Sequence, residues 1–304
     1  MVCLAGPTAA GKSHLALALA ARFGGEIVNG DSLQFYRGMD IGTAKPTLAE
    51  RAQAPHHLYD TLEPDQLFTA GDYATAARPV LAEIAARGRL PIVCGGAGFY
   101  LRALIDGLAE APKRDQALRE RLAEACQRPG LLHRYLRRLD ADAAKRIHSN
   151  DRNKLIRAIE VCLTERPLSE IHARPRPALE GYRVLWLGVH PPRPLLYARI
   201  HERVDEMFAR GLIDEVRALQ TRGYGTHTKA LEGVGYKQCL AYLAGAITLA
   251  EALAETKQRT RNYAKRQLTW FRCDDRIHWL SGFGTDETVI NSAIEQVAAL
   301  AAKV

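Results

Sequence analysis

The chain has 304 residues, of which 47% are hydrophobic and 25% are charged, a composition typical of a soluble globular protein whose core needs no disulfides. Its six cysteines form no CxxC pair and have no histidine partners at zinc-finger spacing, so we expect reduced thiols in a cytoplasmic protein. No apolar run approaches the roughly 20 residues of a membrane span, and no signal peptide is visible, so we expect neither a membrane protein nor a secreted one.

The first hundred residues alternate between short apolar strands and amphipathic helices. Strands are expected at residues 2–5, 26–32 and 92–94, and helices at residues 13–23 and 70–88. Strand–helix–strand units with such short apolar strands are typical of a parallel sheet covered by helices on both faces. The predicted fold class is therefore α/β.

Residues 113–181 differ in character and predict an inserted all-helical domain. They are rich in arginine and alanine and contain no convincing strand. Helices are expected within this insertion at residues 118–126, 131–139, 141–147 and 152–165. A proline-containing segment closes the insertion, a fourth strand is expected at residues 182–190, and long helices are expected from there to the end. The α/β core then comprises residues 1–112 and 182–304.

Positive charge is concentrated in the later part of the chain. The net charge is +8, but residues 1–106 hold nine Lys/Arg against ten Asp/Glu, whereas residues 107–304 hold 33 against 24. The most basic segment, residues 256–272, has six Lys/Arg, no acidic residue and several aromatic residues. This pattern favours contact with a nucleic acid. The alternative is a basic surface that serves solubility, with the aromatic residues forming the buried face of a helix.

A glycine-rich loop follows the first predicted strand. Residues 6–13 match the pattern GxxxxGK[ST] and stand between an apolar strand and an amphipathic helix, which predicts a P-loop NTPase-like core. Backbone N–H groups of such a loop point inward, Lys12 supplies a mobile cation, and the Ser13 hydroxyl can bind Mg²⁺. The predicted phosphate-binding residues are Gly6, Pro7, Thr8, Ala9, Ala10, Gly11, Lys12 and Ser13. The pattern does not distinguish a nucleoside triphosphate from another diphosphate.

Asp31 stands at the end of the second predicted strand. In a doubly wound sheet the carboxyl ends of the strands form the ligand crevice. A carboxylate at that place can hold a metal ion or act as a general base, and its position is compatible with both roles. The alternative is an aspartate that caps a turn and has no chemical role.

Eight sequence segments stand in a fixed order from residue 6 to residue 272. They are GPTAAGKS at 6–13, DSLQFYRGMDIGTAKPT at 31–47, APHHLYD at 54–60, PIVCGGAGFYLRAL at 91–104, NDRNKLIRAIEV at 150–161, RIHERVDEMFARGLIDEV at 199–216, EGVGYKQ at 232–238 and TRNYAKRQLTWFR at 260–272. In this order they resemble the bacterial tRNA dimethylallyltransferase (isopentenyltransferase) family. The resemblance covers nearly the whole chain, and eight matching segments in the same order are very hard to obtain by chance.

The resemblance implies transfer of a dimethylallyl group from dimethylallyl diphosphate to N6 of adenine 37 in tRNAs that read codons starting with U. The P-loop then holds this donor rather than ATP, with Mg²⁺ as the cofactor and Ser13 as its ligand. Asp31 matches the family's catalytic acidic residue and is the expected general base. Arg203 is expected to reach the diphosphate, although Arg203 and Arg199 also fit a solvated basic stripe. The expected catalytic residues are Thr8, Lys12, Asp31 and Arg203, and a monomer is expected.

The family's target adenine is stacked in the anticodon loop and must be pulled out to react. A core with an inserted helical arm, here residues 113–181, would clamp the anticodon stem–loop from both sides. The residues expected to contact tRNA are Asp31, Ser32, Leu33, Gln34, Ala97, Arg119, Asn153, Lys154, Leu155, Ile156, Arg157, Glu232, Gly233, Val234, Gly235, Tyr236, Lys237, Lys265, Arg266 and Arg272. Lys154 and Arg157 fit ordinary surface charges as well.

Ala97 departs from the family pattern, because threonine usually follows the glycine pair there. The change removes a hydroxyl expected to contact tRNA.

Three other functions are compatible with a P-loop. A small-molecule kinase would turn over ATP and would not need the basic segment, and a prenyltransferase of free adenine nucleotides would lack the helical insertion. A non-catalytic RNA-binding protein would not need Asp31 beside an intact loop.

Overall fold

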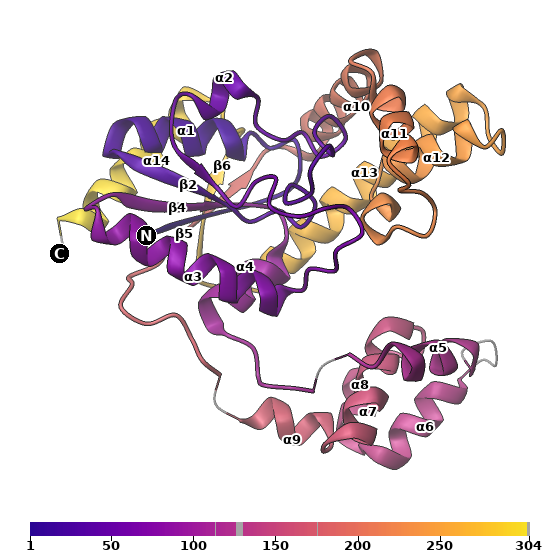
Figure 1. Ribbon diagram of the computed structural model, residues 1–304. Helices are drawn as coiled ribbons and strands as arrows, with labels where there is room; N and C mark the ends of the chain where they lie inside the picture. Colours follow the sequence, from indigo (N-terminus) through magenta and orange to yellow (C-terminus); the bar gives the residue numbers. More distant parts are fainter. Residues whose placement is uncertain (113, 126–129, 175, 303–304) are drawn as a thin grey trace. The chain divides into compact units, whose positions relative to one another are not determined.

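A computed structural model describes residues 1–112, 114–125, 130–174 and 176–302 (Figure 1). The chain divides into two compact units, one formed by Met1–Ile105 with Leu179–Val304 and the other by Asp106–Ala178. The helical insertion thus begins at Asp106 rather than at residue 113 and ends at Ala178 rather than at residue 181. Of the six cysteines, the five described ones are free thiols, and Cys126 lies outside the described residues.

The first unit is built on a six-stranded sheet in which every pair of neighbouring strands is parallel, in the order β3-β2-β4-β1-β5-β6. The strands are β1 Val2–Ala5, β2 Gly25–Asn29, β3 His56–His57, β4 Leu90–Cys94, β5 Leu185–His190 and β6 Ile277–Ser281. The predicted α/β class is confirmed. The expectation of helices alone after the fourth strand is wrong, because β6 pairs with β5 at the edge of the sheet. Its side chains are exposed at two of five positions, so it lacks the continuous apolar run of a central strand.

Helices cover both faces of this sheet (Figure 1). The helices of the first unit are α1 Lys12–Phe23, α2 Leu48–Arg51, α3 Ala70–Ala86, α4 Gly98–Asp106, α10 Arg193–Ala209, α11 Leu212–Thr221, the 3-10 helix η1 Lys229–Glu232, α12 Tyr236–Leu243, α13 Leu249–Phe271 and α14 Glu287–Ala301. Alternate residues of β1 point to opposite faces, so Leu4 packs with α1 and α14, while Cys3 packs with α3, α4 and the end of α13. The sheet is therefore buried on both sides, as its apolar strands predict.

A separate apolar cluster supports the segment that follows β2. Tyr36 and Met39 of this segment are buried against Leu212 and Val216 of α11 and against Tyr236 of α12. Chain elements almost two hundred residues apart therefore hold one another in place. This cluster fixes a loop at the carboxyl end of the sheet, where the candidate site lies.

The second unit consists only of helices. They are α5 Gln116–Ala125, α6 Leu131–Leu139, α7 Ala141–Arg146, α8 Arg152–Thr164 and α9 Leu168–Ala173. The unit has its own core, in which Leu132 and Leu136 of α6 pack against Leu155 and Ile159 of α8. The buried side chain of Asp140 caps α7 by accepting hydrogen bonds from the N–H groups of Ala143 (2.9 Å) and Ser169 (2.7 Å), which ties the start of α9 to α7.

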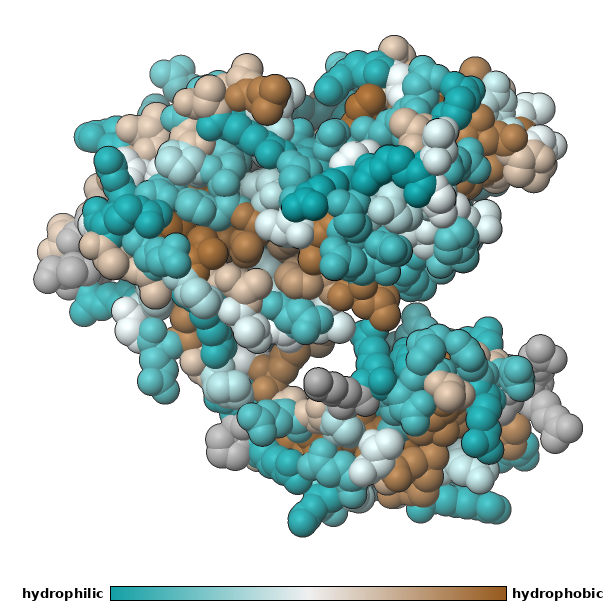
Figure 2. Space-filling view, in the orientation of Figure 1, coloured by the Kyte–Doolittle hydropathy of each residue, from teal (hydrophilic) through white to brown (hydrophobic). Residues whose placement is uncertain are grey.

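Hydrophilic residues cover most of the face of each unit that Figure 2 shows, and apolar residues reach that face only in small patches. Among the described residues, no helix combines the length and the apolar character that crossing a bilayer requires.

Candidate active site

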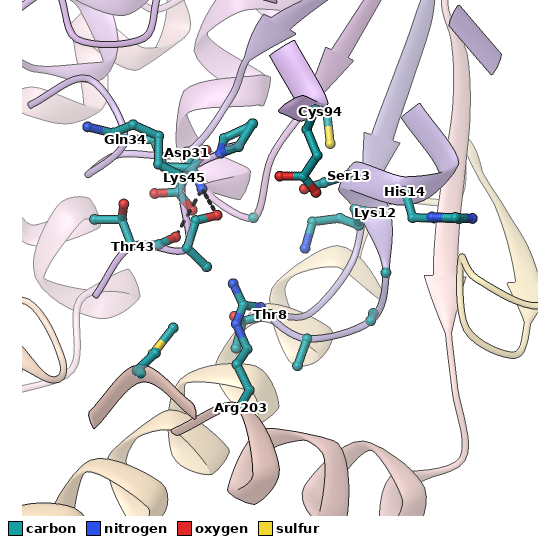
Figure 3. Close-up of a pocket in the computed structure, with 18 of the residues that line it drawn as sticks. Thr8, Lys12, Ser13, His14, Asp31, Gln34, Thr43, Lys45, Cys94 and Arg203 are labelled. Atoms are coloured by element: carbon teal, nitrogen blue, oxygen red, sulfur yellow. Dashed lines mark hydrogen bonds between the residues drawn. The ribbon is translucent and has the colours of Figure 1, made fainter. Parts of the chain in front are cut away.

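The loops after β1, β2 and β4 meet around one cavity of about 630 Å³ (Figure 3). Helices α10 and α13 supply further lining, including Arg199 and Arg203 from α10 and Gln267 from α13. A cavity of this volume is typical of small-molecule sites, and its place at the carboxyl ends of parallel strands is where such folds bind ligands. Parts of the chain separated by more than 250 residues therefore form one site.

The P-loop lies between β1 and α1, as its sequence context predicts. Gly11 has φ of 87°, and a Cβ there would lie only 2.9 Å from the backbone nitrogen of Gly284, so only glycine fits. Helix α1 begins at Lys12, and the N–H groups of its first turn have no acceptor within the helix. The loop residues that line the cavity are Thr8, Ala9, Ala10, Gly11, Lys12 and Ser13; Gly6 and Pro7 do not line it. The geometry suits an anion at the start of a helix.

Three cations surround this anion-binding loop. The Lys12 ammonium donates to the carbonyl oxygen of Pro7 at 2.7 Å, and burial lowers its pKa to about 8. Arg203 reaches from α10 toward the P-loop, on the other side of the cavity from Asp31 (Figure 3), and burial lowers its pKa as well. One turn earlier on the same helix, Arg199 is held by the Thr285 hydroxyl at 3.1 Å. Partly desolvated cations of this kind attract a diphosphate strongly.

Asp31 stabilises the turn after β2 and also lines the cavity, so its position in the turn leaves its carboxylate facing the site. Its carboxylate oxygen Oδ1 accepts the N–H of Leu33 at 2.9 Å, and its own N–H donates to the side chain of Asn29 at 2.8 Å. Burial raises the pKa of Asp31, while the hydrogen bond from Leu33 and the positive charge of Lys12 act in the opposite direction. A carboxylate with a raised pKa, fixed by its own turn and facing a ligand cavity, is suited to accept a proton.

The cavity also contains suitable oxygen donors for a magnesium ion. The Ser13 hydroxyl and the Asp31 carboxylate both line it, beside the phosphate-binding loop. Among the described residues, no group of three or more His, Cys, Asp or Glu side chains is arranged to hold a metal. Mg²⁺ commonly binds to one or two protein oxygens together with substrate phosphates and water, so these residues fit it.

The loop after β2 is held by its own hydrogen bonds. The amide nitrogen of Gln34 donates to the carbonyl oxygens of Thr43 (3.0 Å) and Ala44 (3.2 Å), and the buried ammonium of Lys45 pairs with Asp40 and Asp60, each at 2.6 Å. Gln34 also lines the cavity. Because its amide N–H groups are used inside the loop, its oxygen is the atom best placed to meet a ligand.

Not all residues expected to contact the target base reach the cavity. Asp31 and Gln34 line it, whereas Ser32, Leu33 and Ala97 do not. Leu33 is partly buried and packs against the apolar cluster under the loop, so its side chain has a packing role, and its contact with the base stays a prediction. Ala97 follows the glycine pair and is partly buried.

Residues 232–237 mainly stabilise the loop after β2, which lines the site. Tyr236 is fully buried, and its hydroxyl donates to Glu215 at 2.6 Å. The same carboxylate accepts the N–H groups of Asp40 (3.0 Å), Ile41 (2.7 Å) and Gly42 (3.3 Å). The expected tRNA contact by the Tyr236 side chain is therefore corrected. Within this segment Gly235 is also buried, Gly233 and Val234 are partly buried, and only Glu232 and Lys237 are exposed.

Helix α13 carries the basic segment. Two different roles, RNA contact and packing, are predicted for its cations and its aromatic residues. Lys265 and Arg266 are exposed, and Arg272 donates to the ring of His190 at 2.9 Å. Phe271 is fully buried, as the packing alternative expects, and the ring of Trp270 is covered by the guanidinium of Arg102 at 4.7 Å. The exposed cations remain available to a polyanion.

In the helical unit, several residues expected to contact tRNA are structural. Leu155 and Ile156 are buried in the core of the unit, which corrects the expectation for these two side chains. Arg119 and Arg157 bind the fully buried carboxylate of Glu160 at 3.0 Å and 2.8 Å, and the N–H of Asp115 donates to it at 2.7 Å. Asn153 and Lys154 are exposed.

Glu160→Gln is expected to destabilise the helical unit by about 2 kcal/mol, because it removes the charge that two arginines share. The cost stays below that of a fully buried pair, since the side chains of Arg119 and Arg157 are 21% and 30% exposed and can be hydrated. Hydrogen exchange of α5 and α8 measures it. The control Glu165→Gln breaks only the exposed pair with Arg174 and should cost under about 0.5 kcal/mol. Equal effects of the two variants would contradict the assignment.

Comparisons with known proteins agree with this geometry. The family model described as IPP transferase matches residues 34–274. The chain belongs to the IPP transferase family. It is 54% identical to the tRNA dimethylallyltransferase of Solibacter usitatus over 98% of both chains, and 52% identical to that of Koribacter versatilis over 96% of both.

Solved structures of this family have the same fold. The tRNA isopentenylpyrophosphate transferase of Bacillus halodurans is 38% identical, with a TM-score of 0.73, and the match covers 98% of this chain and 95% of that one. A eukaryotic dimethylallyltransferase that acts on tRNA is 27% identical, with a TM-score of 0.80, and the match covers 98% of this chain and 77% of that one. The P-loop and Asp31 lie upstream of the residues that the family model matches. The sequence match to the Solibacter usitatus relative, which covers 98% of this chain, includes them.

Sequence reasoning missed Gln267 as a site residue. Its side chain is buried, lines the cavity, accepts the N–H of Thr8 at 2.8 Å and donates to the carbonyl oxygen of Gly96 at 2.9 Å. The only available signal was an uncharged amide between the charged and aromatic residues of the basic segment. That signal is weak, because an amide on a helix is usually solvated.

Proposed function

We propose that this chain transfers the dimethylallyl group of dimethylallyl diphosphate to N6 of adenine 37 in tRNAs that read codons starting with U. The products are N6-(dimethylallyl)adenosine and diphosphate. The observation that carries the proposal is one cavity in which a P-loop with Lys12 and Arg203 faces Asp31 (Figure 3). The names and coverage of the relatives support the choice of donor and acceptor.

The residues of the cavity divide the reaction between them. The P-loop N–H groups, Lys12 and Arg203 bind the donor's diphosphate and stabilise the charge that grows on it as the C1–O bond breaks. N6 of the adenine forms the new bond to C1, and Asp31 takes the proton that N6 loses. Ser13 would hold Mg²⁺ beside the P-loop, and the ion would add positive charge at the leaving group. Thr8 lies at the start of the P-loop, where its hydroxyl is available to the same diphosphate.

The acceptor must present an unstacked base to this cavity. Enzymes that modify a base extrude it from its stack, and they hold the flanking backbone through cations. The exposed cations Lys265, Arg266 and Lys237 of the first unit, and Lys154 of the second, are candidates for contacts with the anticodon stem–loop. We propose that the enzyme works as a monomer in the cytoplasm, where tRNA and the donor are both present.

The decisive experiment incubates the protein with Mg²⁺, radiolabelled dimethylallyl diphosphate and an anticodon stem–loop bearing A36-A37-A38. We expect label in this RNA and none in a stem–loop with guanine at position 37. Label in free AMP would favour a prenyltransferase of nucleotides. ATP turnover without prenyl transfer would favour a small-molecule kinase, and RNA binding with no label transferred would favour a binding protein.

Replacing Lys265 and Arg266 by glutamine is expected to weaken binding of the stem–loop about tenfold at low salt. Removing one cation that neutralises a phosphate makes the dependence of log K on log salt less steep by roughly 0.7–0.9, so the slope should change by about 1.5. The measurement is RNA binding at several salt concentrations. The matched control replaces Arg22 and Arg89, which are exposed at the amino end of the sheet, and should leave the slope unchanged. An unchanged slope in the first variant would place the RNA elsewhere.

A further inference from the structure

Gln267 joins two of the loops that line the cavity, the P-loop and the loop after β4. It lies in α13, it is 5% exposed, and its side chain lines the cavity. Its amide oxygen accepts the N–H of Thr8 in the P-loop at 2.8 Å, and its amide nitrogen donates to the carbonyl oxygen of Gly96 at 2.9 Å. No other described side chain hydrogen-bonds both loops.

The fit around this side chain is tight. A Cβ on Gly96 would lie 2.1 Å from the amide nitrogen of Gln267, so a side chain at residue 96 would collide with this amide. A neighbouring glycine, Gly95, packs its backbone directly against that of Gly30, close to Asp31. The amide thus lies between the P-loop and the loop after β4. The loop after β4 in turn packs against Gly30, which directly precedes Asp31, the proposed general base.

A neutral amide can satisfy both partners at once. It accepts from one backbone N–H and donates to one carbonyl, whereas a carboxylate accepts only. The hydrogen bond to Gly96 also offsets the partial negative charge on the carbonyl oxygen of this residue, which lines the cavity. A negative group at this position would repel a diphosphate, and an apolar group would leave a buried N–H and a buried C=O without partners.

We propose that Gln267 is a positioning residue that holds the P-loop in its diphosphate-binding conformation. It acts through the Thr8 peptide and the Gly96 carbonyl and does not itself react. This inference rests on the proposed function in one respect, namely that the P-loop ligand is the donor's diphosphate. It predicts that changes at Gln267 affect donor binding and leave RNA binding intact, although α13 also carries the basic surface.

The test compares Gln267→Glu and Gln267→Leu with the wild-type protein. Calorimetry with inorganic diphosphate and Mg²⁺ should show Kd raised about tenfold or more for Gln267→Glu, and about fivefold for Gln267→Leu. In the prenyl-transfer assay KM for dimethylallyl diphosphate should rise likewise, while KM for the stem–loop stays within about twofold. Thermal unfolding should remain cooperative, with Tm near that of the wild type.

Gln258 provides the matched control, because it is an exposed glutamine on the same helix. Gln258→Leu should leave both KM values and the diphosphate Kd unchanged, and Gln258→Glu should leave the diphosphate Kd and the KM for dimethylallyl diphosphate unchanged. The proposal is overturned if the Gln267 variants bind diphosphate normally, or if both KM values rise together with a collapse of Tm, since that marks a general structural role. Diphosphate binding is measured without RNA or transfer, so a protein that binds diphosphate but prenylates nothing would disprove the proposed function and still test Gln267.

Discussion

Asp31→Asn is expected to lower kcat for prenyl transfer about a thousandfold, a typical contribution of a general base. Asparagine has nearly the same shape, and its Oδ1 can still accept the N–H of Leu33, so the turn after β2 should persist. The loss should therefore reflect the missing base rather than a disordered loop. Single-turnover transfer with saturating donor and RNA measures it.

Two further measurements make this prediction specific. The stem–loop should bind Asp31→Asn and Asp31→Ala with Kd close to that of the wild type. The rate of the wild-type protein should fall as the pH drops, because the protonated carboxylate cannot take a proton. Since burial raises the pKa of Asp31, the midpoint of this fall should lie above the usual value for an aspartate, which is about 3.9. If Asp31→Asn kept most of its activity, another group would have to be the base.

Replacing Lys12 is expected to have the second largest effect. Lys12→Met keeps the length of the side chain but removes its charge from a buried phosphate site, so donor Kd should rise about a hundredfold or more. The mechanism also predicts a pH dependence, because only the ammonium form attracts the diphosphate. With a pKa of about 8 in the free protein, Lys12 is charged at pH 7 and mostly neutral at pH 9. Donor affinity should therefore fall roughly tenfold between these values.

Lys12→Arg tests whether loss of a proton from Lys12 causes the alkaline fall in donor affinity. Arginine stays protonated throughout this range, so the alkaline fall in donor affinity should disappear even if binding is weaker overall. Calorimetry with dimethylallyl diphosphate at pH 7, 8 and 9 measures both proteins. The assignment fails if wild-type affinity is flat over this range, or if the arginine variant shows the same fall.

Local sequence was sufficient for the elements whose signals are local. The apolar run of β1, the GxxxxGK[ST] pattern and the amphipathic helix α1 follow one another within 23 residues, so the P-loop and its place in a parallel sheet could be predicted. The helical insertion was visible because its helices follow one another in the chain. Strand β6 was missed because an edge strand with exposed side chains has no continuous apolar run. Its pairing with β5, about 90 residues earlier, decides its conformation.

For the site, the sequence by itself determined which chemical groups are present: a phosphate loop, a carboxylate after β2 and cations in α10 and α13. Tertiary structure decided which of them share the cavity. It brought Arg203 and Gln267 to the P-loop, and it buried Leu155, Ile156 and Tyr236, which the family resemblance had implied as tRNA contacts. The physical reason is that hydrogen bonding and burial depend on contacts between residues far apart in the chain. A segment's own pattern shows which side chains can do chemistry, whereas only packing shows which of them are already engaged by the fold.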